Sequence, residues 1–372
     1  MAFTFLLTAG GSGGHLFPAQ ALASELGRRG HTVELATDDR AERFSDDFPV
    51  RKIHIVKSAT LSGKSPTALI KTLWNLLVGT VQARGVIKHL KPDAVVGFGG
   101  YPTFPPMFAA RLTGTPSVLH EANGVIGRAN KMLAKGVNAL ASRVPLKGLD
   151  AQMSRKVVLT GNPVRDAVIA KAGAPYPALD AAGPFNLFVF GGSQGAKVFS
   201  DLMPEAIARL PEALRARIHL VQQVRDEDME RVQAAYEVTG FKPELASFFK
   251  DIPELYEKSH LVICRSGASS VTELTVIGRP AFLVPLPNAL DQDQLINAKS
   301  LEAVGGAWTL EQPGLTSERL CDEIARVMED PECLRAAAAA ALSEGKPDSV
   351  ARLADLVEQV AAHEFVAKGV SA

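Results

Sequence analysis

Gly10-Gly11-Ser12-Gly13-Gly14 and Gly191-Gly192-Ser193-Gln194-Gly195 are two glycine-rich stretches that each follow a short apolar segment. A helical pattern follows each of them, over residues 16–26 and 196–210. A strand that runs into a glycine loop at a helix N-terminus presents free backbone N–H groups and the positive end of a helix dipole, so such a loop suits phosphate. Because this arrangement occurs twice, the sequence predicts two similar α/β lobes that face one anionic ligand.

Length and composition indicate a two-domain globular protein. A chain of 372 residues with 47% hydrophobic residues suits two domains. Its 40 basic and 40 acidic residues cancel, so general attraction to nucleic acid is not indicated. Cys264, Cys321 and Cys333 form no C-x-x-C pair, which argues against a disulfide framework or a structural zinc site and fits a reducing cytoplasm. No uncharged apolar run reaches about 18 residues, and the first residues read as a strand instead of a signal peptide.

Apolar strands alternate with helical patterns along both halves, which predicts two Rossmann-like, doubly wound α/β lobes with parallel sheets. The predicted strands cover residues 4–8, 32–36, 52–56, 94–98, 117–120, 139–142 and 157–160, then 187–190, 218–221, 261–264 and 281–284. Residues 161–165 and the Ala- and Pro-rich stretch after them read as a link. We therefore expect an N-terminal lobe over residues 1–165, a C-terminal lobe over 166–348, and a final helix within 349–372 that crosses back to the first lobe.

Both glycine loops also match G-x-S-x-G, the nucleophile elbow of serine hydrolases. Ser12 follows the first strand of the chain, whereas an elbow serine follows a central strand. Ser193 has Asp251 and His260 downstream in the required order, but no HGGG-type segment precedes it. The context favours a phosphate cradle, and a serine hydrolase that uses Ser193 remains an alternative.

A dinucleotide oxidoreductase is a weaker alternative. Neither loop completes the G-x-G-x-x-G fingerprint, because Leu16 stands at the third glycine position of the first loop and the second loop lacks the first pair. The Asp38-Asp39 pair after the second strand could still imitate a ribose-binding acid.

His15 directly follows the first glycine loop, at a predicted helix start. The helix dipole at that end disfavours imidazolium, so we expect a neutral ring that can accept a proton near pH 7. A general base has this property, and a histidine that only braces a neighbouring loop is the alternative.

Polar side chains follow two predicted strands of the second lobe. Glu273 falls in the predicted first turn of a helix, where it can cap backbone N–H groups or accept hydrogen bonds from sugar hydroxyls. Gln294 and Asn297 are i,i+3 neighbours on a predicted helix, which suits hydroxyl recognition, and a plain polar loop is the alternative.

An apolar stripe at helical spacing lies within residues 68–81. It contains Ile70, Leu73, Trp74, Leu77 and Val81, and the cations around it are Lys64, Lys71, Arg84, Lys88 and Lys91. Such a stripe usually faces a core, but an exposed apolar patch ringed by cations binds anionic bilayers. The sequence leaves both interpretations open.

Together these motifs resemble one family, the bacterial UDP-N-acetylglucosamine transferases that convert lipid I to lipid II in peptidoglycan synthesis. The resemblance also rests on Gly99-Gly100-Tyr101, His120-Glu121-Ala122-Asn123-Gly124, Gly161-Asn162-Pro163-Val164-Arg165, Arg265-Ser266-Gly267-Ala268 and the segment 291–297. The motifs cover most of the chain, and their combination is highly specific although each alone is weak. Two positions depart from the family pattern: Ala122 stands where many relatives carry Gln, and residues 221–225 replace a His-Gln-Thr/Ser-Gly pattern.

The resemblance implies a B-type glycosyltransferase fold and an inverting transfer of GlcNAc from UDP-GlcNAc to the 4-hydroxyl of MurNAc in undecaprenyl-pyrophosphoryl-MurNAc-pentapeptide. The C-terminal lobe would hold the donor and the N-terminal lobe the acceptor. His15 would be the catalytic base, with Glu121 as a second catalytic candidate. The implied UDP-GlcNAc contacts are Ser12, Gly13, Gly14, Asn123, Arg165, Ser193, Phe249, Ala268, Ser269, Ser270, Val271, Thr272, Glu273, Gln294 and Asn297. Tyr101 and Asn130 would line the acceptor side.

Direct attack of the acceptor hydroxyl needs a base and a stabilised leaving group but no covalent intermediate. Helix N-termini and Arg165 can offset charge on UDP. The acidic pairs Asp38-Asp39 and Asp291-Gln292-Asp293 belong to no metal constellation, so we expect no protein-bound metal and no cofactor. Expected partners are UDP-GlcNAc, lipid I, the anionic inner-membrane surface and other cell-wall synthesis and division proteins, but not nucleic acid. The expected location is peripheral, on the cytoplasmic face of the bacterial inner membrane. A sugar-nucleotide isomerase on the same architecture is a further alternative.

Overall fold

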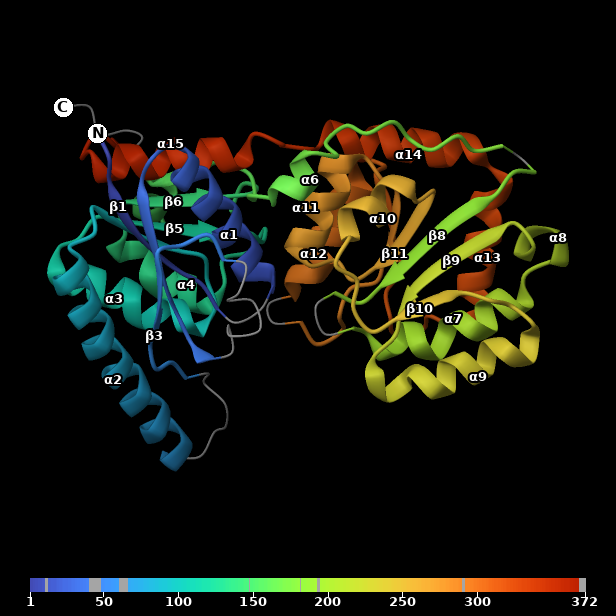
Figure 1. Ribbon diagram of the computed structural model, residues 1–372, viewed down its shortest axis with the longest axis horizontal. Coiled ribbons are helices and arrows are strands. Elements are labelled where there is room, and N and C mark those ends of the chain that lie inside the picture. The colour runs from blue at the N-terminus through green and yellow to red at the C-terminus, as the bar shows by residue number, and fades with distance from the viewer. Residues whose placement is uncertain are drawn as a thin grey trace. The chain divides into compact units, whose positions relative to one another are not determined.

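The computed structural model describes residues 1–10, 13–39, 48–59, 66–146, 148–180, 182–192, 195–289 and 292–367. The chain divides into two compact units (Figure 1). The first contains Met1–Arg165 and Pro347–Ala372, and the second contains Asp166–Lys346. Each unit is a parallel sheet with helices around it, which confirms the predicted α/β class with two doubly wound lobes.

The first unit has a seven-stranded sheet in the order β3-β2-β1-β4-β5-β6-β7. The chain order reverses beside β1, and this is where open α/β sheets bind ligands. The strands are β1 (Thr4–Thr8), β2 (Thr32–Thr37), β3 (Lys52–Ile55), β4 (Ala94–Gly97), β5 (Ser117–Glu121), β6 (Ala139–Ser142) and β7 (Val157–Leu159). The helices are α1 (Gly13–Arg28), α2 (Pro66–Leu90), α3 (Phe104–Thr113), α4 (Arg128–Leu133), α5 (Ala151–Arg155) and α15 (Ser349–Ala361).

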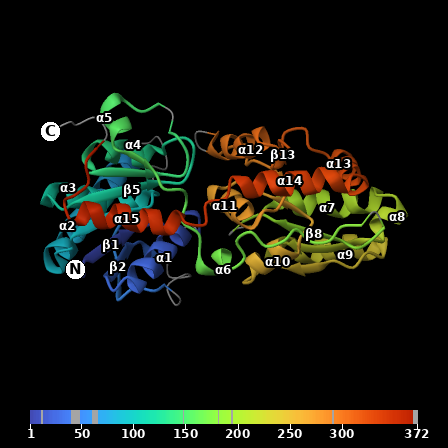
Figure 2. The same cartoon turned by 90° about the horizontal axis from the view of Figure 1, so that it is seen from above.

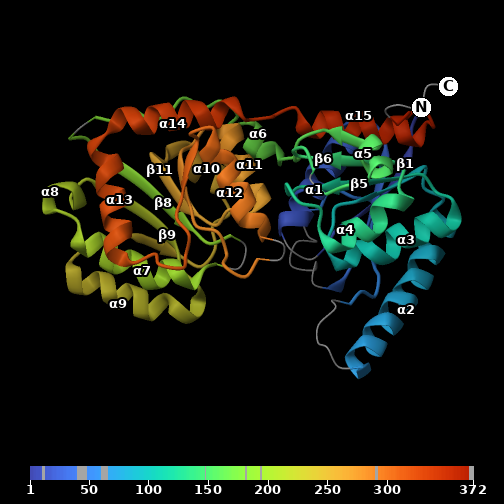
Figure 3. The ribbon, with the colours of Figure 1, turned by 180° about the vertical axis from the view of Figure 1, so that it is seen from behind.

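Helices cover both faces of this sheet, so the side chains of its central strands β4, β5 and β6 are buried on both sides. Phe5 and Leu7 of β1 join a core with α1 and α15, whereas Leu6 between them joins a core with α2 and α3. Figure 3 shows α3 and α4 together on one side of this unit, with α2 extending from α3. Burial on both faces is why these strands read as continuous apolar runs instead of alternating ones.

The C-terminal helix α15 lies beside α1 and crosses β4, β5 and β6 of the first unit (Figure 2). Leu353 and Val357 on its inner face are fully buried in the same core as Phe5 and Leu7. This buried apolar face attaches the tail of the chain to the first unit.

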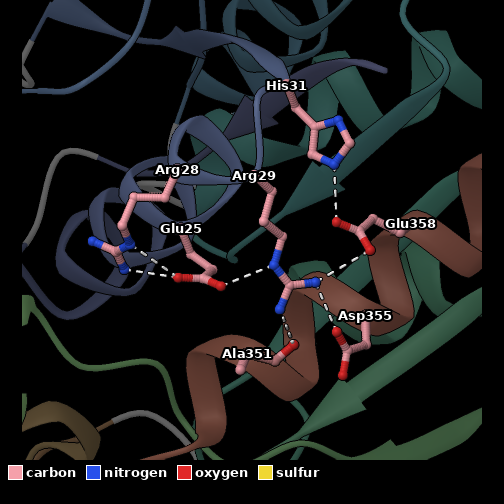
Figure 4. Close-up of polar contacts among 7 residues, drawn as sticks. All are labelled: Glu25, Arg28, Arg29, His31, Ala351, Asp355 and Glu358. Atoms are coloured by element: carbon pink, nitrogen blue, oxygen red, sulfur yellow. Dashed lines mark hydrogen bonds and ion pairs between the residues drawn. The ribbon is translucent and has the colours of Figure 1, made fainter. Parts of the chain in front are cut away.

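An ionic contact reinforces the junction of α1 and α15 (Figure 4). Arg29, just beyond α1, lies 2.7 Å from the Asp355 carboxylate and 3.1 Å from that of Glu358, while Glu25 of α1 holds its Nε. His31 donates from Nε2 to Glu358 at 2.9 Å, because its Nδ1 accepts the Phe3 backbone N–H at 3.0 Å. Both basic residues of the α1–β2 turn therefore face the acidic side of α15.

The second unit has a six-stranded parallel sheet in the order β10-β9-β8-β11-β12-β13. Its strands are β8 (Phe185–Phe190), β9 (Ile218–Gln223), β10 (Glu244–Ala246), β11 (Leu261–Cys264), β12 (Ala281–Leu283) and β13 (Ala307–Thr309). The helices are α6 (Asp166–Ile169), α7 (Lys197–Arg209), α8 (Glu212–Arg215), α9 (Met229–Thr239), α10 (Ile252–Lys258), α11 (Ala268–Ile277), α12 (Asp293–Ala303), α13 (Ser317–Glu329) and α14 (Pro331–Ser343). The chain order again reverses beside the first strand, β8.

A fully buried arginine, Arg279, holds three segments of the second unit together. It donates to the carbonyls of Tyr256 and Glu257 near the end of α10, and to those of Ile277 and Gly278 at the end of α11. It also donates to residues 174 and 175, so the Ala- and Pro-rich stretch belongs to this unit. A cation near two helix C-termini satisfies carbonyls that have no partner within their own helices.

The element boundaries differ from the sequence prediction in a few places. The prediction missed β10 and β13, edge strands of three residues each, because Glu244 and Thr309 interrupt their short apolar runs. Helix α2 continues past residue 81 to Leu90, because Ala83 and Ile87 extend its buried face beyond Gly79. Gly79 weakens the helical signal but is required here, since a Cβ would lie 1.9 Å from the Lys57 carbonyl oxygen.

The packing of α15 makes a direct prediction about stability. Leu353→Ala should lower the free energy of unfolding of the first unit by about 2 to 5 kcal/mol, because it removes a fully buried side chain from the core. Arg352→Ala on the outer face of the same helix is the matched control, since that side chain is 51% exposed and pairs with Asp348 in the neighbouring turn. Chemical denaturation of both variants measures the difference. Equal unfolding midpoints would contradict the proposed attachment.

Candidate active site

Three strand ends of the first sheet meet at its carboxyl edge. Gly10 follows β1, Gly99 and Gly100 follow β4, and Glu121 ends β5. A Cβ on Gly10 would lie 3.4 Å from the Gly100 Cα, so the two glycine segments approach backbone to backbone. Gly99 and Gly100 have φ values of 89° and 77°, which side chains with a Cβ rarely adopt. These loops leave room for His15 at the sheet edge.

His15 lies in the first turn of α1 and faces the Gly99-Gly100 turn. Its Nδ1 is 2.8 Å from the Phe98 carbonyl oxygen. A carbonyl only accepts, so Nδ1 carries the proton and Nε2 of the neutral ring keeps its lone pair. A Cβ on Gly99 would lie 3.2 Å from His15 Cε1, and one on Gly100 would lie 3.2 Å from Cδ2. The two glycines therefore set the position of the imidazole.

Loss of hydration lowers the pKa of His15 below its usual range, and the hydrogen bond to the Phe98 carbonyl opposes this shift only in part. The expected neutral ring is therefore present, but the main cause is burial, where the sequence pointed to the helix dipole. A neutral histidine with an unprotonated Nε2 has the chemistry of a general base.

Glu121 is buried and receives hydrogen bonds at both carboxylate oxygens. Oε1 accepts the Asn123 backbone N–H at 3.1 Å, and Oε2 accepts the Gly127 N–H at 2.9 Å and the Asn130 amide at 2.8 Å. Burial raises the pKa of Glu121, while these donors act in the opposite direction. The carboxylate thus holds the loop from Asn123 to Asn130, a positional role that the sequence did not predict.

Asn130 connects Glu121 to the glycine turn. A Cβ on Gly99 would lie 3.3 Å from the Asn130 amide nitrogen as well as 3.2 Å from His15. His15, Asn130 and Glu121 are therefore gathered around one turn, although they come from α1, α4 and β5. Tyr101 begins a short 3-10 helix directly after this turn.

His120, next to Glu121, is a second imidazole in this region and is buried, and the sequence assigned it no separate role. Burial lowers its pKa to about 4, so the ring is neutral at physiological pH. It donates from Nε2 to the Gly161 carbonyl at 3.1 Å, which connects β5 to the segment 161–165. Arg165 at the end of that segment lies over the Phe17 ring of α1, 4.2 Å from its centroid. Phe17 also packs beside Gly13, so Arg165 reaches the N-terminal part of α1.

In the second unit the glycine loop after β8 closes on itself. A Cβ on Gly191 would lie 2.2 Å from the Ala196 nitrogen, so only glycine permits this backbone contact. Gly192 and Gly195 have φ values of 87° and 68°. Helix α7 starts immediately afterwards at Lys197. Four predicted or neighbouring site residues, Ser12, Ser193, Gln194 and Asp291, lie outside the described residues, and Gly14 is exposed at the start of α1.

Helix α11 begins at Ala268 and contains the predicted donor-site residues Ser269, Ser270, Val271, Thr272 and Glu273. Glu273 is its sixth residue and is buried, so the prediction that it lies in the first turn was wrong. Glu273 therefore lies beyond the free N–H groups of this helix, which belong to its first turn. Val271 and Thr272 are also buried, while Ser269 and Ser270 are partly exposed.

Gln294 and Asn297, the two predicted amide residues, lie on α12 and contact the loop before α11. Asn297 is fully buried and donates to the Ser266 carbonyl at 3.2 Å. Ser266 in turn donates to the Gln294 carbonyl at 2.8 Å, and the Gln294 side chain accepts the Leu286 N–H at 3.0 Å. These bonds connect the carboxyl ends of β11 and β12, where the sequence placed the sugar contacts.

The serine hydrolase alternative fails on the position of its histidine. His260 precedes β11 and its Nδ1 accepts the N–H of Asn186, near the start of β8. Gly191 follows the other end of β8, so His260 lies at the opposite edge of the sheet from the glycine loop. Within the described ranges, no three His, Cys, Asp or Glu side chains gather in a way that could hold a metal ion.

The predicted apolar stripe on α2 is exposed. The exposed fractions of Ile70, Leu73, Trp74 and Leu77 are 66%, 56%, 64% and 56%. Lys71, Arg84 and Lys88 of the same helix are also exposed, while Lys64 lies outside the described residues. Figure 1 shows α2 projecting away from the sheet of its unit. None of the helices in the described part of the chain has the length and apolarity needed to cross a bilayer.

Comparison with known proteins agrees with this architecture. The Glycosyltransferase family 28 N-terminal domain matches residues 5–142, and the family 28 C-terminal domain matches residues 186–353. The chain is 52% identical over 363 residues to the UDP-N-acetylglucosamine--N-acetylmuramyl-(pentapeptide) pyrophosphoryl-undecaprenol N-acetylglucosamine transferase of Rhizobium etli strain CIAT 652, covering 98% of this chain and 97% of that protein. The enzyme of the same name from Rhizobium meliloti strain 1021 gives the same identity and coverage.

Solved structures show the same relationship. The chain resembles the MurG protein of Acinetobacter baumannii with a TM-score of 0.77 and 28% identity, over 96% of this chain and 100% of that one. The UDP-GlcNAc 2-epimerase of Neisseria meningitidis shares the fold, with a TM-score of 0.63 over 97% of this chain and 100% of that one, but only 14% identity. The transferases and the epimerase share one fold, and the higher sequence identity groups this chain with the transferases. This chain belongs to the family of UDP-N-acetylglucosamine--N-acetylmuramyl-(pentapeptide) pyrophosphoryl-undecaprenol N-acetylglucosamine transferases, within glycosyltransferase family 28.

Proposed function

We propose that this protein transfers N-acetylglucosamine from UDP-N-acetylglucosamine to the 4-hydroxyl of MurNAc in undecaprenyl-pyrophosphoryl-MurNAc-pentapeptide, lipid I. The product is lipid II, with inversion at the anomeric carbon. The observation that carries this proposal is the 52% identity over nearly the full length of transferases so named. The absence of the hydrolase arrangement around His260 and the low identity to the epimerase argue against the alternatives.

Transfer of radiolabel from UDP-GlcNAc to lipid I tests this function directly. We expect label in a lipid product that depends on both substrates. UDP should also raise the melting temperature of the protein, whereas free GlcNAc should not, because a ligand that binds only the folded state stabilises it. Covalent labelling by a fluorophosphonate, with no lipid product, would instead support a serine hydrolase.

His15 is the proposed general base for the acceptor hydroxyl. Its Nε2 lone pair is free in the tautomer that the Phe98 carbonyl imposes, and its lowered pKa keeps the ring unprotonated at physiological pH. The hydroxyl proton would pass to Nε2 as the oxygen attacks the anomeric carbon and UDP leaves. Asn130 and Glu121 support the glycine turn beside the ring, so we assign Glu121 to positioning ahead of proton transfer.

His15→Ala should lower kcat by roughly 10² to 10⁴ while UDP affinity stays near that of the wild type. His15→Asn is the matched control, because an amide can still donate to the Phe98 carbonyl but cannot accept the proton. A base predicts that both variants lose turnover, whereas a bracing role predicts that Asn restores it. Steady-state kinetics at saturating substrate and UDP calorimetry make the comparison.

The pH dependence of kcat in the wild-type enzyme is an independent test of His15 as the general base. A base acts when unprotonated, so kcat should fall as pH drops through the pKa of His15. Because burial lowers that pKa, this acidic limb should lie below the ordinary histidine value of about 6.5.

The donor is assigned to the second unit. Helices α7 and α11 both begin at the carboxyl edge of its sheet, where their N-termini favour the negative charge of a diphosphate. Ser193 would contact the diphosphate, Glu273 the ribose, and the backbone at Phe249 the uracil. Gln294 and Asn297 would contact GlcNAc hydroxyls. Departing UDP is then stabilised by dipoles that are already in place before reaction.

The exposed α2 stripe is the proposed membrane contact. Ile70, Leu73, Trp74 and Leu77 present apolar side chains to solvent beside the cations of the same helix. An apolar strip with cations around it suits the surface of an anionic bilayer, where a polyprenyl-linked acceptor resides. This contact would place the enzyme at the cytoplasmic face of the inner membrane, alongside other proteins of cell-wall synthesis and division.

Changing Leu73 and Trp74 together to Ser should weaken binding to anionic vesicles without unfolding the protein, because both side chains are more than half exposed. Val238→Ser, at an 89% exposed position on α9, is the control for loss of an exposed apolar side chain elsewhere. Vesicle co-sedimentation and thermal melting measure the two effects. Unchanged vesicle affinity, with the variant folded, would reject the membrane contact.

A further inference from the structure

Gln223, the last residue of β9, joins two segments of the second unit through its side chain. Its Oε1 accepts the Gly191 N–H at 2.9 Å, and its Nε2 donates to the Ser247 carbonyl at 3.1 Å. The side chain is only 6% exposed, so both bonds form away from water. One buried amide therefore connects the start of the glycine loop with the segment that follows β10.

The segment that follows β9 holds the other end of the glycine loop. A Cβ on Gly195 would lie 2.7 Å from Arg225 Cγ, so the methylenes of Arg225 pack against this glycine. The Arg225 guanidinium is in turn held by Asp228 at 2.6 Å and by Glu227 at 2.9 Å. The Gly195 N–H donates to the Gly192 carbonyl at 3.1 Å, which completes the turn. Because Asp228 and Glu227 pair with the guanidinium, Arg225 contributes to the glycine loop through the packing of its methylenes on Gly195.

The segment at the far end of the bridge is anchored independently. Ser247 directly precedes Phe248 and Phe249, and the Phe249 ring is buried edge-to-face on Phe188, with centroids 5.8 Å apart. The Val224 N–H donates to the Ala246 carbonyl at 2.9 Å, which continues the pairing of β9 with β10. With its ring buried, Phe249 can offer only backbone groups to a ligand.

We propose that Gln223 is a positioning residue for the donor nucleotide, which sets the separation between the backbone at Gly191 and the backbone at Ser247. This inference rests on the proposed function, in which the glycine loop receives the diphosphate and the Phe249 segment receives the uracil. A nucleotide must span both segments, and a bridge that exists before binding removes the cost of ordering them. Gln223 itself touches no reacting atom.

The neighbouring amide shows that this arrangement is not a general property of the strand. Gln222 points to the opposite face of the sheet, where it accepts the Tyr236 hydroxyl at 2.6 Å and donates to the Phe199 carbonyl at 3.3 Å. Those partners belong to the core of the unit and to no loop at the carboxyl edge.

Two substitutions separate the halves of the bridge. Gln223→Met removes both hydrogen bonds at nearly constant volume, so we expect the Kd for UDP and the KM for UDP-GlcNAc to rise roughly ten-fold. The kcat and the KM for lipid I should change little. Gln223→Glu keeps an acceptor for Gly191 but repels the Ser247 carbonyl, so it should raise the Kd for uridine and the Kd for UDP by similar factors. Gln223→Met should raise the Kd for UDP more than the Kd for uridine. Gln233→Met, an exposed position on α9, is the matched control.

The outcomes distinguish this inference from the function on which it rests. A wild-type protein that neither binds UDP nor labels lipid I would remove the proposed function itself. Wild-type activity together with folded Gln223 variants whose Kd for UDP and uridine stay within two-fold of wild type would overturn the positioning role alone. Failure of both variants to fold would also overturn it, because Gln223 would then be a core residue. A purely structural role would lower the melting temperature and leave both dissociation constants unchanged.

Discussion

The close approach of backbone to backbone at the carboxyl edges of the two sheets is the constraint on which the rest of this structure depends. In the first unit a Cβ on Gly100 would lie 3.2 Å from the Gly10 Cα, and in the second a Cβ on Gly191 would lie 2.2 Å from the Ala196 nitrogen. A parallel sheet delivers its strand ends side by side, but ordinary side chains would keep the following loops apart. Glycine at these positions lets the loops close, and the adjoining helices then begin next to the strand ends.

Closed glycine loops leave little freedom to the side chains that pack on them. His15 is held between the Phe98 carbonyl and the Gly99-Gly100 turn, and the same bond determines which ring nitrogen is free. Glu121 receives two backbone N–H groups and the Asn130 amide, so its carboxylate organises a loop. His15 is partly buried and Glu121 is buried, and each has a backbone partner, which avoids the cost of removing a polar group from water unpaired. The pKa shifts at this site follow from burial first and from hydrogen bonds second.

Side chains also connect segments that are distant in the sequence. Arg29 and His31 join the α1–β2 turn to α15. Their partners, Asp355 and Glu358, lie 326 and 327 residues later in the sequence. Arg279 gathers the ends of α10 and α11 with residues 174 and 175. Gln223 does the same for two loops at the sheet edge. Each connector uses several donors or acceptors at once, and so holds its segments in one arrangement.

The sequence by itself determined the fold class and most of the strands, because strands buried on both faces must be apolar throughout and the helices between them must be amphipathic. It also located both glycine loops and His15, since glycine and a following helix start are local signals. The edge strands β10 and β13 gave no such signal, because each has only two apolar residues beside a polar one. Only the tertiary structure decided that Glu273 lies beyond the first turn of α11, that the α2 stripe is exposed, and that His260 lies at the wrong edge for a hydrolase. Likewise, nothing local to Gln223 or Glu121 reveals their partners, because those partners are backbone groups of loops that come together only when the sheets form. Periodicity reports which residues are buried, whereas the identity of what each buried polar group contacts depends on strand order and register.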